Sequence, residues 1–311
     1  MIQVTRYEEK HRRTWDEFVT RAKNGVFLFQ RDYMEYHQDR FRDHSLLFFV
    51  DEKLVALMPA NADGTALISH GGLTFGGVVS DNRMRAGTML EIFDALKDHL
   101  AAEGIGRLVY KAVPYIYHSI PAEEDLYALF RTGARLIRRD LSSTISQRER
   151  ISLTKGRRWS LKQSQTHGLD VRESGDFRKF MAIEAEVLQR RHNVLPVHSA
   201  GEIAMLADRF RDNIKLFAAF KETEMFAGVV IYESKNVAHA QYMAATDEGK
   251  QKAALDCILD FLINQQYAAT PYFDFGVSTE QEGQYLNVGL AEHKESFGAR
   301  AVVYDFYEIN V

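Results

Sequence analysis

The chain has 311 residues, 46% of them hydrophobic and 12% aromatic, which is enough to bury one large core or two medium ones; two domains are the better expectation. Five prolines and 26% charged residues exclude disordered and fibrous classes, and a formal net charge of −4 argues against a dedicated DNA-binding protein. The single cysteine, Cys257, excludes an internal disulfide and points to a reducing compartment. No apolar run approaches the roughly 18 residues that a membrane span needs, so we expect a soluble, cytoplasmic protein without a membrane span.

Hydrophobic periodicity divides the first half of the chain into strands and helices. Met84–Glu103, for example, repeats apolar residues at helical spacing and stops at Gly104, a residue type that commonly ends helices. The predicted elements are a strand at Ile2–Arg6, helices at Arg12–Ala22 and Asp32–Phe41, strands at Ser45–Asp51, Lys53–Ala60 and Ala66–His70, a helix at Met84–Glu103, a strand at Arg107–Val113, a helix at Ala122–Arg131 and a strand at Arg135–Ser146.

The second half repeats this order of elements without repeating the residues. Its predicted elements are a strand at Leu169–Glu173, helices at Phe177–Arg190 and Ala200–Phe210, strands at Ile214–Lys221, Met225–Glu233 and Val237–Thr246, a helix at Lys252–Gln266, a strand at Tyr272–Phe275, a helix at Tyr285–Ser296 and a strand at Ala301–Ile309. The sequence therefore predicts an α/β (α+β) protein with two tandem domains, each a mixed central sheet flanked by helices. The expected domains are residues 1–146 and 168–311.

A basic segment joins the two predicted domains. Nine basic residues against two acidic ones give Arg135–Gln165 a local charge of +7, although the chain as a whole is acidic. Residues 147–167 are predicted to form a basic linker helix, and a solvated helix is the most common meaning of such a run. The alternative is an electropositive wall for a nucleotide-activated substrate or an RNA acceptor stem.

The repeated order of elements is that of the Gcn5-related acyltransferase (GNAT) fold, in which an antiparallel meander separates from the following parallel strand and opens a cleft. The chain resembles the tandem-domain, Fem-type branch of this superfamily over nearly its whole length. The resemblance is carried by TPYFDFGVSTEQEGQYLNVGLAEHKESFGAR (Thr270–Arg300), SHGGLTFGGVVS (Ser69–Ser80), AVPYIYHSIPAEEDLYALFR (Ala112–Arg131) and LPVHSAGEIAMLADRFRDNIKLFAAF (Leu195–Phe220).

The resemblance implies an N-acyltransferase. The activity we expect is transfer of an acyl group from acyl-coenzyme A, as co-substrate, to the amino group of a nucleotide-linked amino sugar for cell-surface polysaccharide such as O-antigen or capsule. One alternative is a Fem-type peptidyltransferase that uses aminoacyl-tRNA and acts on a peptidoglycan precursor, the one case in which RNA is a partner. Another is a GNAT-like domain that binds a ligand without catalysis.

The resemblance places the acyl donor in the second domain, between Val237–Thr246 and Tyr272–Phe275. The turn after the first of these strands is expected to hold the phosphates of the donor on free backbone N–H groups. The phosphate-binding pattern of single-domain members, Arg/Gln-x-x-Gly-x-Gly/Ala, is missing here, and a solvated helix start with Asp247 as its cap is the alternative. The predicted donor-binding residues are Thr246, Gly249, Lys250 and Lys252.

Three residues are predicted to be catalytic. Asp274, at the end of the central strand, can accept the proton of the attacking amine, and His239 lies on the strand that lines the cleft. Lys294 occupies the lysine position of a Lys-x-x-Phe-Gly sequence, and the resemblance implies that it stabilises charge at the transfer site. Structural alternatives are a strand-end cap for Asp274, a core histidine for His239 and a helix C-terminal cation for Lys294.

The acceptor is expected to contact aromatic and basic side chains. Tyr242 also lies on the cleft strand, but strict alternation puts residues three apart on opposite faces, so at most one of His239 and Tyr242 is expected to face the substrate. The other predicted substrate-binding residues are Tyr115, Tyr117, His118 and Arg191, for which packing and ordinary helix-end charge are the alternatives. The eleven histidines show no His-Glu-x-x-His spacing, so no metal is expected.

Overall fold

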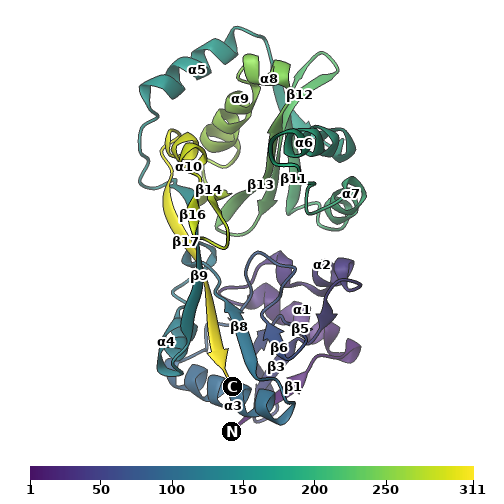
Figure 1. Ribbon diagram of the computed structural model, residues 1–311, viewed down its shortest axis with the longest axis vertical. Coiled ribbons are helices and arrows are strands. Elements are labelled where there is room, and N and C mark those ends of the chain that lie inside the picture. Colours follow the sequence, from purple (N-terminus) through teal and green to yellow (C-terminus); the bar gives the residue numbers. More distant parts are fainter. The chain divides into compact units, whose positions relative to one another are not determined.

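The computed structural model describes the backbone of residues 1–311 and the side chains of all of them except residues 191 and 192 (Figure 1). The chain forms two compact units. Unit 1 consists of Met1–Leu141, Thr279–Tyr285 and Val303–Val311, and unit 2 consists of Ser142–Ser278 and Leu286–Val302. The long strands β9 (Arg135–Ser146) and β17 (Arg300–Asn310) each have residues in both units, as does the short strand β16 (Tyr285–Leu286).

Unit 1 contains two sheets. One has the order β1-β3-β4-β7, and in the other β8 lies between β17 and β6 and pairs in parallel with β6. The further elements of unit 1 are β1 (Ile2–Arg6), α1 (Arg12–Arg21), α2 (Arg31–Met34), β2 (Arg42–Asp43), β3 (Leu46–Val50), β4 (Lys53–Met58), β5 (Asn61–Asp63), β6 (Ala66–Ile68), β7 (Val79–Ser80), α3 (Ala86–Ala102), β8 (Arg107–Lys111), α4 (Glu124–Arg131) and β15 (Thr279–Glu280).

Unit 2 is built on a sheet of order β10-β11-β12-β13-β14-β9, in which only the β13–β14 pair is parallel. Its further elements are α5 (Lys155–Gln165), β10 (Asp170–Ser174), α6 (Phe177–His192), α7 (Ala200–Arg209), β11 (Ile214–Lys221), β12 (Glu224–Glu233), β13 (Val237–Ala245), α8 (Asp247–Gln251), α9 (Ala254–Phe261) with a π-helical turn at Leu262–Gln266, β14 (Tyr272–Val277) and α10 (Val288–Glu295).

Helices cover both faces of the unit 2 sheet. α9 packs on one face, where Ile258 and Leu259 join a core that includes Val229 and Ile231 of β12. α6 and α7 lie on the other side in Figure 1, and Phe180 of α6 fills the space above the sheet that a larger residue at position 228 would occupy. The side chains of His239, Tyr242 and Asp274, described below, lie on this α6 face.

Several predicted boundaries differ from the observed ones. The helix predicted at Asp32–Phe41 is only α2 followed by a single 3-10 turn. The helix predicted from Lys252 begins at Ala254, because Ala253 has a left-handed backbone that separates α8 from α9. The helix predicted from Tyr285 begins at Val288, where the Asn287 side chain accepts a hydrogen bond from the Leu290 N–H.

The limits of the two units also differ from the predicted domain limits. Residues 303–311 belong to unit 1 although they follow unit 2 in the chain, and residues 142–146 belong to unit 2. Both differences arise because β9 and β17 are long strands whose halves pair with different neighbours: β9 with β14 in unit 2, and β17 with β8 in unit 1. Within the predicted linker, α5 is a helix and is part of unit 2.

No helix in the described part of the chain is both long enough and apolar enough to cross a membrane.

Candidate active site

The parallel strands β13 and β14 of unit 2 separate soon after they meet. They pair only from Val237 opposite Tyr272 to His239 opposite Asp274, and β13 then continues to Ala245 without β14 beside it. Gly276, two residues after Asp274, has φ of +76°, a conformation that residues with a side chain rarely adopt. The two strands therefore no longer pair with each other beyond the point where His239 and Asp274 lie.

Asp274 is fully buried at this point and accepts three hydrogen bonds. Its Oδ1 accepts from Ser142 Oγ at 2.6 Å and from Thr144 Oγ1 at 2.7 Å, and its Oδ2 lies 2.7 Å from His239 Nδ1. Burial by itself raises the pKa of this carboxyl, but the hydrogen bond and charge of His239 and the two hydroxyls outweigh that effect and lower it. Asp274 is therefore an ionised carboxylate with its oxygens occupied.

This geometry fixes the orientation and tautomer of His239. A carboxylate can only accept, so the His239 nitrogen that faces Asp274, Nδ1, carries a proton, and Nε2 of a neutral ring then carries the lone pair. No described residue forms a hydrogen bond with Nε2, and 13% of the side chain is exposed. His239 can therefore take a proton from an amine while Asp274 stabilises the resulting imidazolium. Of the two side chains, His239 is the one that presents a lone pair outside the hydrogen bonds between them.

A β-bulge changes the expected relation between His239 and Tyr242. His239 lies opposite Tyr232 and Tyr242 opposite Val230, because the register shifts between these pairs and Gln241 is an extra residue in β13. Tyr232 and Val230 are two apart in β12 and share a face, so their partners share it too. The prediction that His239 and Tyr242 point to opposite faces is wrong, since alternation is interrupted at the bulge.

Tyr242 extends this polar row to α6 and the start of α7. Its hydroxyl lies 2.6 Å from His198 Nδ1, and burial raises the pKa of Tyr242 to about 12. Glu184 of α6 is buried, its charge contributes to that shift, and no described residue donates a hydrogen bond to its Oε2. Burial raises the pKa of Glu184 to about 7. A buried carboxyl that titrates near neutrality is common where protons are exchanged with a substrate.

Lys294 of α10 lies beside the same separation of strands. Its buried Nζ donates to the carbonyl oxygens of Gly276 and Val277, each at 2.8 Å. Burial lowers the pKa of Lys294 to about 8, and the charge of Asp274 opposes this decrease. The structure thus brings together the three predicted catalytic residues around Gly276.

A cavity of about 700 Å³ opens in unit 2 beside the end of β13. Met243–Ala245 form one wall, and residues of α9 and α10, including Leu255, Leu290 and His293, form others. Its volume is in the range of small-molecule sites. The lining combines Ser160, Val187, Met243, Ala244, Ala245, Gly249, Lys250, Ala253, Leu255, Asp256, Asn287, Gly289, Leu290 and His293.

The predicted donor-binding residues lie at α8, and their groups already have partners. Thr246 Oγ1 caps the helix by accepting from the Gly249 N–H at 3.0 Å. Lys250 Nζ contacts Asp247 at 2.6 Å, and Lys252 Nζ contacts Glu248 at 3.2 Å. A Cβ at position 249 would lie 2.2 Å from the Phe226 carbonyl oxygen, so this glycine is required for packing against β12. Gly249 and Lys250 also line the cavity.

The remaining predicted substrate-binding residues are not part of this cluster. Tyr115, Tyr117 and His118 belong to unit 1, where Tyr117 is buried against Phe75 with ring centroids 4.6 Å apart. His118 Nε2 lies 3.1 Å from the Val113 carbonyl oxygen, and burial lowers the pKa of His118 to about 4. Only Tyr115 of these three is largely exposed. The side chain of Arg191 lies outside the described residues.

Comparison with solved structures identifies the fold. The crystal structure of FemX superposes with a TM-score of 0.69 over 99% of this chain and 97% of that chain, at 10% identity. The C-terminal domain of a putative lysylphosphatidylglycerol synthetase from Agrobacterium fabrum gives 0.63 over 97% and 92%, at 13% identity. A tandem GNAT protein from the clavulanic acid biosynthesis pathway gives 0.52 over 100% and 98%, at 9% identity. No family model matches the sequence, and a search of curated proteins gives no match.

These similarities establish a mixed α/β fold of the tandem GNAT-like, Fem type, which confirms the predicted fold class. The internal repeat supports the same assignment, since each unit pairs a meander strand in parallel with the strand that follows a long helix: β6 with β8, and β13 with β14.

Proposed function

We propose that the chain is a transferase that moves an acyl or aminoacyl group to an amine, and that unit 2 carries the transfer site. The observation that supports this most strongly is that β13 and β14 separate directly after a hydrogen-bonded His239–Asp274 pair. In this proposal His239 takes the proton of the attacking amine, and Asp274 holds it in the required tautomer. Lys294 lies beside the reacting centre and offsets the negative charge that develops on the acyl oxygen.

The proposed donor is acyl-coenzyme A, with its acyl arm in the 700 Å³ cavity beside β13, and the proposed acceptor is the amino group of a nucleotide-linked amino sugar. The cavity supports the donor site because it reaches the end of β13 and includes Gly249 and Lys250. The acceptor is supported by the sequence resemblance to amino-sugar acyltransferases. The row of Tyr242, His198 and Glu184 provides polar contacts for it on the α6 face.

Charge reversal at α8 tests the donor site. We expect the double variant Lys250→Glu, Lys252→Glu to raise the apparent Kd of acyl-coenzyme A at least about tenfold, or about 1.4 kcal/mol, and to leave the acceptor's Kd unchanged. Both lysines are paired with acids, so reversal also places new negative charges beside Glu248 and beside Asp247, which keeps its ion pair with Arg190. Calorimetric titration of each ligand measures the effect.

A matched control reverses Lys215 and Lys235, which lie at the opposite end of the β11–β13 meander. Equal weakening of acyl-coenzyme A binding by both double variants would show a general charge effect, and loss of acceptor affinity alone would assign α8 to the other substrate.

An exposed surface of α5 favours a second candidate, an aminoacyl-tRNA donor. Arg158 and Trp159 each lie three or four positions from both Lys155 and Lys162 on this helix, so the four side chains share a face, and all four are exposed. Cationic side chains beside an exposed aromatic ring are a common surface for contacting RNA phosphates and bases. The α8 lysines, by contrast, are already paired with acids.

The two donors are distinguished by their effect on thermal stability. We expect acyl-coenzyme A to raise the melting temperature and an RNA acceptor-stem hairpin to leave it unchanged, since only a ligand of the native state stabilises it. Stabilisation by the hairpin that Arg158→Glu with Lys162→Glu abolishes, without any effect of acyl-coenzyme A, would replace the first candidate by the second. Binding of either donor without any acyl transfer to amines would instead indicate a non-catalytic binding domain.

A further inference from the structure

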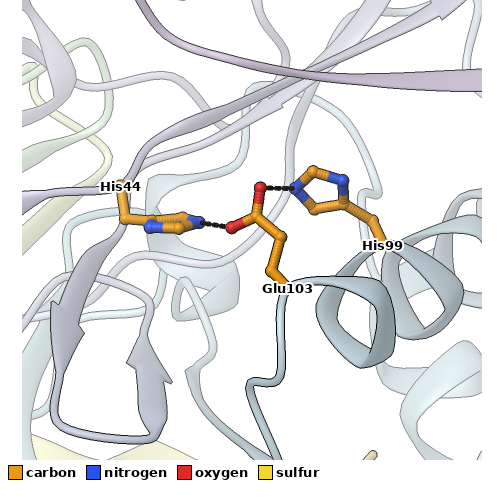
Figure 2. A group of neighbouring side chains, drawn as sticks. All are labelled: His44, His99 and Glu103. Carbon is orange, nitrogen blue, oxygen red and sulfur yellow. Dashed lines mark ion pairs between the residues drawn. The ribbon is translucent and has the colours of Figure 1, made fainter.

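Two histidines and a glutamate meet in unit 1, away from the residues discussed so far (Figure 2). His44 lies between β2 and β3, and its backbone N–H donates to the Ala60 carbonyl oxygen at 2.9 Å. His99 is in the last turn of α3, and Glu103 follows the end of that helix, with its N–H donating to the His99 carbonyl oxygen at 3.1 Å. All three backbone positions are therefore held by regular structure.

The Glu103 carboxylate lies between the two imidazoles (Figure 2). His44 Nε2 lies 3.0 Å from Glu103 Oε2, and His99 Nε2 lies 3.4 Å from Glu103 Oε1. The group offers one ligand atom from each residue, and these atoms all lie within 4.8 Å of one another. Four-coordinate zinc with bonds of about 2.0–2.2 Å separates neighbouring ligand atoms by roughly 3.3–3.5 Å. The two histidine–glutamate separations, 3.0 and 3.4 Å, are close to this size.

The two imidazole nitrogens are buried, and no described residue forms a hydrogen bond with either of them. They lie at ion-pair distance from the carboxylate, but without the direction of a hydrogen bond. Buried polar atoms without a partner are uncommon because each costs free energy. Two imidazole nitrogens and a carboxylate oxygen that lie within 4.8 Å of one another are a ligand set of transition-metal sites.

A charged histidine pair that holds Glu103 by ion pairing is the competing explanation. Such ion pairing is normally accompanied by an N–H···O hydrogen bond, and neither contact with Glu103 has the direction of one. Asp43 is engaged by Arg31 at 3.2 Å and by the Ser45 hydroxyl at 2.6 Å, so it is not a competing partner of His44.

We propose that His44, His99 and Glu103 bind a Zn²⁺ ion that joins the β2–β3 turn to the end of α3. The two imidazoles bind through Nε2 and the glutamate through a carboxylate oxygen, and water completes the coordination. Nitrogen and carboxylate ligands without thiolates suit Zn²⁺. This departs from the expectation that the chain binds no metal, which rested on the missing His-Glu-x-x-His sequence. The i, i+4 spacing of His99 and Glu103 places two ligands on one side of a helix, and the third comes from a turn distant in the sequence.

Titration of the metal-free full chain with Co²⁺ tests the site, because Co²⁺ bound in place of Zn²⁺ absorbs visible light according to its ligands. We expect one equivalent to give intense bands typical of four-coordinate Co²⁺, Zn²⁺ to displace it, and Zn²⁺ to raise the melting temperature. His99→Gln and Glu103→Gln should each weaken binding at least tenfold. Both positions are less buried than His44, so these variants test the ligands with the least disturbance of the fold.

His167→Gln, at a partly exposed histidine that follows α5, is the control and should bind Co²⁺ as the unaltered chain does. The proposal is overturned if the unaltered chain gives only the weak spectrum of hydrated Co²⁺, or if His99→Gln and Glu103→Gln retain the bands and the thermal stabilisation. Circular dichroism of each variant confirms that it is folded. If His99→Gln is unfolded, the Co²⁺ titration of Glu103→Gln alone decides whether the site exists. The Glu103 side chain is partly exposed, so this substitution should leave the fold intact.

Discussion

Replacing His239 with glutamine should lower the turnover rate by at least about a hundredfold, the lower end of what acid–base assistance contributes. Glutamine has a similar size and can still bond to Asp274, but it cannot accept the proton of the amine. Asp274→Asn should lower turnover by a similar factor, because an amide that faces the histidine no longer fixes the tautomer with Nε2 unprotonated. Steady-state assays that follow free thiol release from the acyl donor measure both effects.

The shape of the pH–rate profile separates catalysis from a structural role. Loss of a general base removes the dependence of turnover on the ionisation of that base, whereas a packing defect lowers the rate equally at every pH. The shape of the profile should therefore change in His239→Gln, with a melting temperature close to that of the unaltered chain. His167→Gln is the matched control. A normal rate in His239→Gln would return His239 to the role of a core histidine bonded to Asp274.

Replacing Glu184 with glutamine should increase the free energy of unfolding more at pH 8 than at pH 4.5. Burial raises the pKa of Glu184 from 4.5 to about 7, so the folded chain keeps a proton that the unfolded chain releases between these pH values. The free energy of unfolding therefore falls as pH rises through this window, by at most about 3 kcal/mol for a shift of this size. The amide of glutamine does not titrate, so the variant lacks this dependence. The free energy of unfolding of the variant minus that of the unaltered chain should therefore increase by about that amount from pH 4.5 to pH 8.

Urea unfolding at pH 4.5, 7 and 8 measures this difference. Glu186→Gln is the matched control, because Glu186 lies on the same helix, is exposed and contacts Arg190. The change in free energy of unfolding caused by Glu186→Gln should not reproduce the increase with pH that we expect for Glu184→Gln. An equal pH dependence in the Glu184→Gln variant and the unaltered chain would show that Glu184 is not buried as a proton-binding group. A buried acid that reduces stability at neutral pH is a typical cost of a functional site.

Much of the fold could be predicted because the local signals are strong. The meanders, the two long helices and the final strand follow from hydrophobic periodicity, and the closing segment placed Lys294 and Asp274 near one another through its resemblance to Fem-type proteins. The short strands β5 and β7 are not predicted, since two or three residues of strand carry no detectable alternation. The start of α10 is predicted too early for the same reason, because Tyr285–Leu286 form the two-residue strand β16.

The rest of the candidate site depends on tertiary structure. Glu184 is an ordinary glutamate of an amphipathic helix in the sequence, and it differs only because that helix covers the β13 face. Gln241 carries no signal for a bulge, so the shared face of His239 and Tyr242 could not be deduced. The hydroxyls of Ser142 and Thr144 reach Asp274 only because β9 pairs with β14, a contact between strands far apart in the chain.

The division of β17 between the units has a consequence for the order of events during synthesis. Unit 1 begins with Met1 but also needs Val303–Val311, whose strand covers one edge of β8 by pairing Phe306 with Lys111. The ribosome makes roughly 5–20 residues per second, so this edge waits roughly ten to thirty seconds after Leu141 for its partner. Unit 2 is completed first. An unpaired strand edge invites association with other chains, so the nascent N-terminal half is open to aggregation through β8 until β17 emerges.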